Sequence, residues 1–324
     1  MYTLDTLKTG LRVLTAPVDG TASVTVMVFA GAGSRYEVQG ERGISHFLEH
    51  MFFKGGKKYK TTEEVSRAID GVGGDFNAFT GKEYAGYYVK VEGSHVRMAC
   101  DVLSDMLENA SFPQEEIEKE RGVIMEEERM YQDTPMYRAG WDFEELLYGD
   151  HPLGWDTIGT EEVIKGVQQA DFVKHRNQLY APKNLVLTFS GKITQKEALA
   201  LAEEFFAGLK GDHERSFVPF TEFGKEKVFV RTKQTEQAHL VIGVPGVCAV
   251  DPHHFTEKLL AIILGGNMSS RMFSRIREAK GLCYYISTEV DGYLDAGSPS
   301  TRASSETRRS PGRSRIPCII SLLW

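Results

Sequence analysis

The segment His46-Phe47-Leu48-Glu49-His50 contains the residues of this chain that are best suited to chemistry. On a helix, positions i, i+3 and i+4 lie on one face, so the two imidazoles and the carboxylate would point the same way. Neutral imidazole nitrogens are common zinc ligands, and a carboxylate just before the second histidine can sit beside a metal rather than on it. The spacing therefore predicts a metal site with two histidine ligands, His46 and His50, and an adjacent base, Glu49.

A catalytic zinc ion takes three protein ligands and leaves a fourth position for water, so a third ligand must come from elsewhere. The acidic segment 115–128, expected to be helical, is the richest source. Glu120 and Glu127 lie about two turns apart on one face of that helix, whereas Glu126 and Glu128 point away. Either Glu120 or Glu127 could bind the metal, with the other hydrogen-bonded to a ligating histidine. A solvated helix face with i,i+4 ion pairs is the ordinary alternative for this segment.

The composition limits the classes of function that fit. The chain has 324 residues, enough for two packed units, and its net charge of −7 and pI near 5.8 argue against nucleic-acid binding. Its four cysteines are scattered and include no Cys-x-x-Cys pair, so neither a disulfide framework nor a cysteine zinc site is indicated. No stretch approaches the roughly 20 apolar residues of a spanning helix, and no signal-like segment begins the chain. We therefore expect a cytoplasmic protein with no nucleic-acid or membrane partner.

The hydrophobic pattern predicts strands and helices around the His/Glu segment. Alternation over residues 23–29 predicts a strand, and residues 43–53 are expected to form the helix that carries the two histidines. A second helix is expected to begin after Thr61, a suitable N-cap. Aromatic and β-branched residues at 76–80 and 84–91 predict two neighbouring strands. The predicted site therefore lies on a helix between strands.

Breaks in periodicity divide the chain. Glycine, proline and mixed charges at 211–226 predict a linker that follows a zinc-binding domain at 1–210. A partial second domain is expected at 227–297, beginning with a strand near 228–232. Residues 298–324 are basic and lack hydrophobic periodicity, so we expect an aberrant tail that cannot bury a core.

Several motifs together resemble the M16 (pitrilysin-type, inverzincin) zinc metallopeptidases, in particular the bacterial relatives of the mitochondrial processing peptidase β subunit. The inverted order His-x-x-Glu-His is a zinc peptidase signature. The resemblance covers roughly residues 2–297, and its motifs are jointly specific. They are GISHFLEHMFFKG at 43–55, GGDFNAFT at 73–80, ERGVIMEE at 120–127, YAPKN at 180–184, LGGNMSSRMF at 264–273 and REAKGLCY at 277–284.

The resemblance implies an α+β fold of two homologous units, each a mixed, mainly antiparallel sheet covered by helices, with the second unit incomplete. It implies a zinc-dependent endopeptidase in which Glu49 is the general base. In the family the last glutamate of the second motif is the third zinc ligand, which selects Glu127 and leaves Glu120 as the partner of a ligating histidine.

The resemblance also implies how substrate is bound. An extended peptide would pair with the strand edge at Asn77 and Ala78 as an added strand. Arg277 and Tyr284 would come from the second half of the enclosing chamber, in a homodimer or with a related subunit, to bind substrate and support the oxyanion. The expected partners are therefore a peptide substrate and a second chain.

The resemblance ends after Gly297, where family members continue with further helices and strands. We interpret the basic tail as the product of a frameshift or a truncated gene model. Translation of the encoding DNA in the other reading frames tests this hypothesis, because one of them should continue the domain.

Three other functions are compatible with parts of this pattern. A catalytically inactive family subunit or scaffold would normally lack part of the His/Glu constellation, which is complete here. A zinc enzyme of the S-ribosylhomocysteine lyase type also uses His-x-x-Glu-His, but it would be a small single domain with a catalytic cysteine. A purely structural two-domain protein would have no need of the motif.

Overall fold

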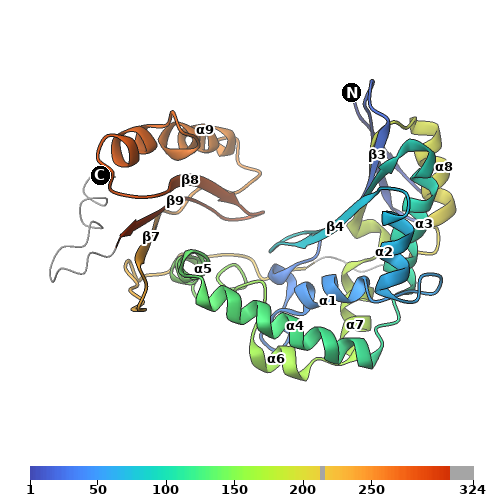
Figure 1. Ribbon diagram of the computed structural model, residues 1–324, viewed down its shortest axis with the longest axis horizontal. Helices are drawn as coiled ribbons and strands as arrows, with labels where there is room; N and C mark the ends of the chain where they lie inside the picture. Colours follow the sequence, from blue (N-terminus) through green and yellow to red (C-terminus); the bar gives the residue numbers. More distant parts are fainter. Residues whose placement is uncertain (212–215, 307–324) are drawn as a thin grey trace. The chain divides into compact units, whose positions relative to one another are not determined.

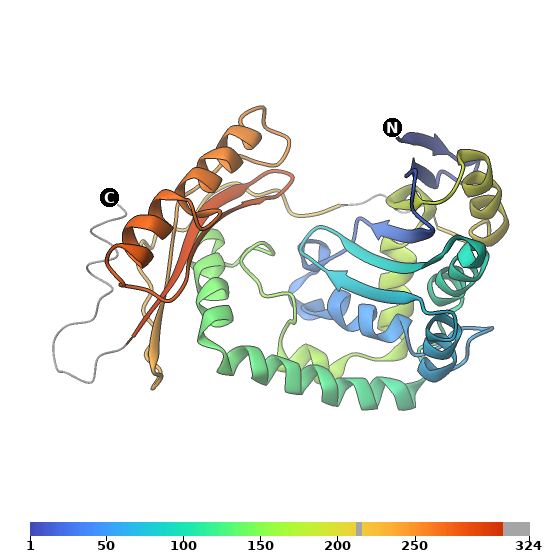
Figure 2. The same ribbon diagram turned by 45° about the horizontal axis from the view of Figure 1, so that its top comes forward.

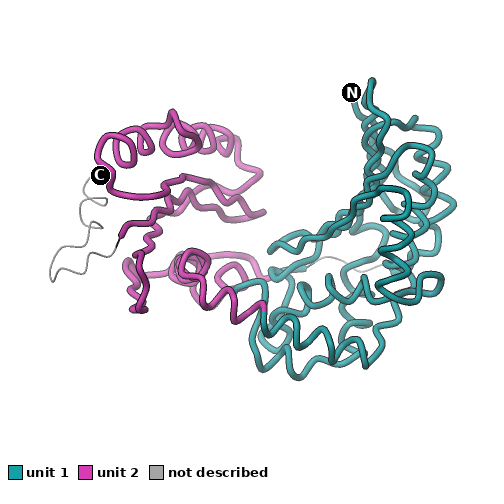
Figure 3. The backbone as a smooth tube through the Cα atoms, viewed as in Figure 1, with its two compact units in different colours: residues 1–126, 156–217 teal, residues 127–155, 218–324 magenta. Residues whose placement is uncertain are grey.

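The protein forms two compact units, shown in a computed structural model that describes residues 1–211 and 216–306 (Figure 3). The first unit comprises the described residues of Met1–Glu126 and Asp156–Phe217. The second comprises Glu127–Trp155 and the described residues from Val218 onward. Each unit is described by itself below.

The first unit is built on a six-stranded sheet with the order β1-β2-β6-β3-β5-β4. Neighbouring strands are antiparallel except β2 and β6, which are parallel. β4 therefore lies at one edge of the sheet, beside β5 (Figure 2). The strands are β1 (Thr3–Thr6), β2 (Arg12–Pro17), β3 (Ser23–Ala30), β4 (Asp75–Thr80), β5 (Ala85–Glu92) and β6 (Leu185–Gly191).

The core of the first unit lies on one face of this sheet. Strict alternation buries every second residue of β3, as the sequence predicts, and Val26 pairs with Val89 of β5 and Phe189 of β6. Helices α3 (Val96–Asn109) and α8 (Gln195–Phe205) pack against the sheet (Figure 1). Alternation of apolar and polar residues is thus sufficient to explain which face is covered.

Helix α1 (Ile44–Phe52) carries the His/Glu segment on its polar side and buries its apolar side completely. Phe47 contacts Phe172 of α7 (Gln169–Leu179) edge to face, with ring centroids 4.9 Å apart. Phe52 lies between Tyr87 and Tyr180, at 5.2 and 5.1 Å. These aromatic contacts fix the rotation of α1 about its axis.

The remaining helices of the first unit follow local signals. Helix α2 (Thr62–Asp70) begins after Thr61, whose hydroxyl accepts a hydrogen bond from the Glu64 N–H at 3.2 Å, as expected for an N-cap. The acidic segment forms one long helix, α4 (Gln114–Asp133). The other elements are α6 (Glu161–Gly166) and the 3-10 turns η1 (Ser34–Tyr36), η2 (Gln39–Glu41), η3 (Gly93–His95) and η4 (Pro182–Asn184).

The second unit is a three-stranded antiparallel sheet with the order β7-β9-β8 and its own helices. Two small buried clusters form its core, Ile276, Cys283, Ile286 and Ala303 in one and Tyr148, Leu153 and Ala296 in the other. The α+β fold with a smaller second unit is thereby confirmed. Its elements are β7 (Gln237–Gly243), β8 (Ile286–Gly292), β9 (Gly297–Glu306), α5 (Pro135–Tyr148), α9 (His254–Gly265) and the π-helix η5 (Phe273–Glu278).

The units differ from the expected division at 1–210, 211–226 and 227–297. The boundary falls inside the continuous helix α4, between Glu126 and Glu127, because the following helix α5 packs against β7. Residues 228–232, expected to be a strand, are irregular. There Arg231 donates two hydrogen bonds to Asp142 of α5, at 2.8 and 2.9 Å, in place of a strand ladder.

The expected loss of structure after Gly297 is not seen up to Glu306. Residues 297–306 form β9, the middle strand of the second sheet, and most of their side chains are buried. Its side chains are mostly small serine, threonine and alanine residues, and the hydroxyl of Thr301 lies 2.9 Å from that of Thr288 on β8. Hydrophobic periodicity could not show such a strand. The rest of the predicted tail, 307–324, lies outside the described residues.

Within the described part of the chain, no helix has the length and apolar character needed to cross a membrane.

We predict that His175 makes the first unit sensitive to acid. Burial on α7 lowers the pKa of His175 to about 4, so the unfolded chain, with a pKa near 6.5, binds its proton first as pH falls. Stability is therefore lost between about pH 6.5 and 4. His175→Gln, which can keep a contact with Ser45, should lose less stability over this range, by up to roughly 3 kcal/mol. Urea denaturation at several pH values, with wild type and His175→Gln both treated with chelator, measures the free energy of unfolding. An equal loss of stability with falling pH in the two proteins would contradict the prediction.

Candidate metal centre

Helices α1 and α4 bring together the residues that the sequence singled out. His46, His50 and Glu127 each offer one ligand atom, and these atoms all lie within 4.8 Å of one another. The two Nε2 atoms of the histidines are 3.3 Å apart. Two imidazoles and a carboxylate are a donor set that suits zinc in a catalytic site, so the residues present fit this ion.

Glu127 faces α1 because of the pattern along α4. Ile117, Glu120 and Ile124 are buried on one side of this helix, at spacings of three and four residues. Glu127 continues the same stripe one step further. The exposed neighbour Glu126 lies on the outer side, as expected from the spacing.

Glu120 occupies a different place from Glu127. Its Oε1 lies 2.7 Å from Nδ1 of His50, and its other oxygen pairs with the ammonium group of Lys54. Burial raises the pKa of Glu120, but hydrogen bonds from His50 and Lys54 outweigh burial and hold the pKa below its usual value. An ionised carboxylate on Nδ1 leaves Nε2 of His50 for the cluster. The geometry therefore favours Glu127 over Glu120 as the third ligand.

The charge state of His46 also suits metal binding. Its pKa is lowered to about 3, mainly by burial and also by the neighbouring His50, whereas Glu120 acts in the opposite direction. The imidazole is therefore neutral at neutral pH and can offer a lone pair to a cation.

Glu49 lies on α1 between the two histidines in sequence, next to a pair of buried phenols. The hydroxyls of Tyr87 and Tyr180 are 2.8 Å apart, and both side chains are buried. Burial is the main reason that the pKa values of both phenols are raised, and the negative charge of Glu49 contributes to each. The carboxylate thus has neutral hydroxyl groups in its vicinity.

Asn77 and Ala78 lie on β4, the edge strand that packs against α1. Just beside them, the ring of Phe76 lies 5.7 Å from that of Phe53, the residue that ends α1. The side-chain oxygen of Asn77 accepts a hydrogen bond from the backbone N–H of Ala78 at 2.9 Å. The structure therefore brings the expected substrate strand next to the helix with the histidines.

Arg277 and Tyr284 lie together in the second unit and are described there alone. Nε of Arg277 donates to the carbonyl oxygen of Tyr284 at 2.7 Å, and its guanidinium lies 4.6 Å from the ring centroid of Phe273. The Tyr284 side chain is 75% exposed. The two residues therefore lie next to each other in the second unit, and their role toward a substrate stays a prediction.

Two side chains near the cluster were not assigned a role from the sequence. Lys54 follows α1 and holds Glu120, and only the tertiary fold brings them together. Glu37 is buried before the start of α1, and burial raises its pKa to about 7 although hydrogen bonds from Gly43 and Ser45 lower it. No motif spacing indicates Glu37, because it lies in irregular chain between two short turns.

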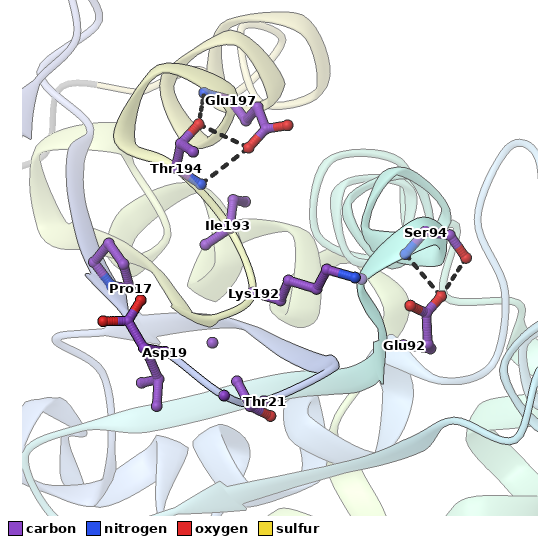
Figure 4. Close-up of a pocket in the computed structure, with 13 residues that line it drawn as sticks. Pro17, Asp19, Thr21, Glu92, Ser94, Lys192, Ile193, Thr194 and Glu197 are labelled. Carbon is purple, nitrogen blue, oxygen red and sulfur yellow. Dashed lines mark hydrogen bonds between the residues drawn. The ribbon is translucent and has the colours of Figure 1, made fainter.

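A separate pocket of about 650 Å³ lies where β2, β5 and β6 end and α8 begins (Figure 4). Four of its polar side chains are engaged in local caps. Thr194 and Glu197 bond each other at the start of α8, and Glu92 accepts from Ser94 (Figure 4). None of the residues predicted to act in chemistry lines this pocket.

Comparison with known proteins gives the same family over nearly the whole chain. The model of insulinase (peptidase family M16) matches residues 12–161, and that of the peptidase M16 inactive domain matches residues 166–313. An uncharacterized zinc protease of Bacillus subtilis, YmxG, is 36% identical over 292 residues, covering 90% of this chain and 71% of the relative. An uncharacterized zinc protease of Rickettsia bellii is 35% identical over 297 residues, covering 91% and 71%.

Solved structures show the same fold. The crystal structure of a protease from Helicobacter pylori superposes with a TM-score of 0.90 at 24% identity, and the match covers 100% of this chain and 79% of that one. The resemblance inferred from the motifs is thereby confirmed: the chain belongs to peptidase family M16.

Proposed function

We propose that this protein is a zinc-dependent endopeptidase. The observation that carries the proposal is the convergence of His46, His50 and Glu127 from α1 and α4, with Glu49 on the same helix as the two histidines. The zinc proteases among its relatives support the metal, and the family supports a peptide substrate.

Each side chain has a distinct task in this proposal. His46, His50 and Glu127 would hold zinc, which when bound activates water and polarises the scissile carbonyl. Glu49 takes a proton from the attacking water and delivers it to the leaving amine nitrogen. Glu120 keeps Nδ1 of His50 hydrogen-bonded and so orients its ring.

The edge strand β4 offers a place for the substrate. A peptide in extended conformation can add to a sheet edge, where main-chain hydrogen bonds give affinity that tolerates many sequences. In the structure the N–H of Ala78 is held by the Asn77 side chain. Substrate binding would therefore exchange that local hydrogen bond for one to the peptide. Arg277 and Tyr284 would complete the site from a second copy of the chain.

We predict that Glu49→Gln abolishes cleavage while zinc remains bound, because the amide keeps the size of the side chain but cannot take up a proton. Loss of a general base typically costs about 10²–10⁴-fold in rate. Hydrolysis of an internally quenched peptide and metal analysis of the same sample measure the two effects. The control is Glu126→Gln on the outer side of α4, which should change neither. Near-normal turnover of zinc-loaded Glu49→Gln would disprove the mechanism.

We predict that Glu127→Gln loses zinc to a chelator far more readily than wild type, because it replaces a charged ligand with a neutral amide. Glu120→Gln should have a smaller effect, of roughly 10–100-fold in affinity, since it removes only the partner of a ligating histidine. Competition titration with a coloured chelator ranks the variants. The reverse order would assign the third ligand to Glu120.

We predict that chelation stops cleavage by the wild-type chain and that added zinc restores it. A catalytically inactive subunit is the alternative, and it would show no chelator-sensitive hydrolysis at any protein concentration. Measuring solution mass on the same samples shows whether activity follows formation of a dimer, as expected if Arg277 and Tyr284 act on a partner.

A further inference from the structure

Helix α1 starts at a residue that cannot cap it. Its N-cap is Gly43, at φ 93°, and a Cβ there would overlap the carbonyl oxygen of Ile158. This position therefore requires glycine, which has no side chain to accept hydrogen bonds from the first backbone N–H groups. Another part of the chain must satisfy them.

Glu37 satisfies the first turn of α1 from outside the helix. Its Oε2 accepts from the N–H of Gly43 at 2.7 Å, and its Oε1 accepts from the N–H of Ser45 at 2.8 Å. The Glu37 residue is only 3% exposed. Both oxygens of a buried carboxyl group thus face the start of the helix, where the helix dipole favours negative charge.

Ser45 extends this arrangement to a second helix. Its hydroxyl lies 3.0 Å from Nε2 of His175 on α7, and both side chains are buried. Ser45 directly precedes His46. The first turn is therefore held by Glu37 on its backbone and by His175 on its side chain, immediately before the first histidine of the cluster.

Two other helices of the first unit, α2 and α8, use a simpler device. Thr61 and Thr194, each directly before the helix that it caps, accept hydrogen bonds from the backbone N–H groups of Glu64 and Glu197 at the surface. Burying a carboxyl group is costlier than capping with an exposed hydroxyl. The free-energy cost of burying Glu37 is expected where a helix must be held accurately, because metal ligands need placement within about 0.5 Å.

We propose that Glu37 is a positioning residue for the metal centre, which fixes where α1 begins and its position along its own axis, and thereby the approach of His46 and His50 to Glu127. The inference rests on the proposed zinc site and extends it to a residue that touches neither metal nor substrate. A helix as short as α1 takes its position mainly from tertiary contacts. At its beginning, Glu37 supplies the two hydrogen bonds to the backbone.

The test compares zinc binding by Glu37→Gln and by Thr194→Ala in the full chain. The glutamine amide would turn its nitrogen toward one backbone N–H, so one of the two hydrogen bonds is lost. Thr194→Ala removes an N-cap from α8, away from the cluster. We expect Glu37→Gln to weaken zinc binding about tenfold or more in competition with a chelator, and to alter the visible spectrum of the Co²⁺-substituted protein. Thr194→Ala should lower thermal stability but change neither reading.

Glu37→Asp provides a second variant, because it keeps the carboxyl group on a shorter arm. It should restore part of the zinc affinity lost in Glu37→Gln, and it carries the test if Glu37→Gln does not fold. Zinc affinity and a Co²⁺ spectrum equal to wild type in the folded Glu37 variants would overturn the inference alone. A wild-type chain that binds no zinc would overturn the proposed function and this inference together.

Discussion

The structure of the candidate site depends on how α1 buries its apolar side. Phe47 packs against Phe172 of α7, and Phe52 packs against Tyr87 of β5 and Tyr180. This packing fixes the rotation of α1 about its axis. With that rotation set, the histidines necessarily face α4. The polar constellation is thus a consequence of the hydrophobic core beneath it, because close-packed interiors allow little adjustment.

The sequence predicts those parts of the site whose geometry is local. His46, Glu49 and His50 belong to one helix, so their spacing alone places them on one face. Spacing alone does not choose between Glu120 and Glu127, since both lie on the same stripe of α4, whereas the family motif and the contact of Glu120 with His50 favour Glu127. No periodic pattern indicates Glu37 or Lys54. Glu37 lies in irregular chain before α1, and Lys54 meets Glu120 only through the tertiary fold.

The same distinction applies to the fold. Strand β3 and helix α2 follow from alternation and from an N-cap, both of which are local signals. The division into units was predicted differently because one helix, α4, runs through the boundary and no composition change marks it. Strand β9 does not follow from hydropathy, because most of its buried residues are serine, threonine, alanine or glycine rather than large apolar residues.

The buried phenols next to Glu49 have a consequence for electrostatics. Because their pKa values are raised, Tyr87 and Tyr180 remain neutral at neutral pH and well above it. The two phenol hydroxyls therefore act on Glu49 as dipoles, and they carry no charge that changes around neutral pH. Any change of charge around Glu49 must then come from groups other than these two phenols.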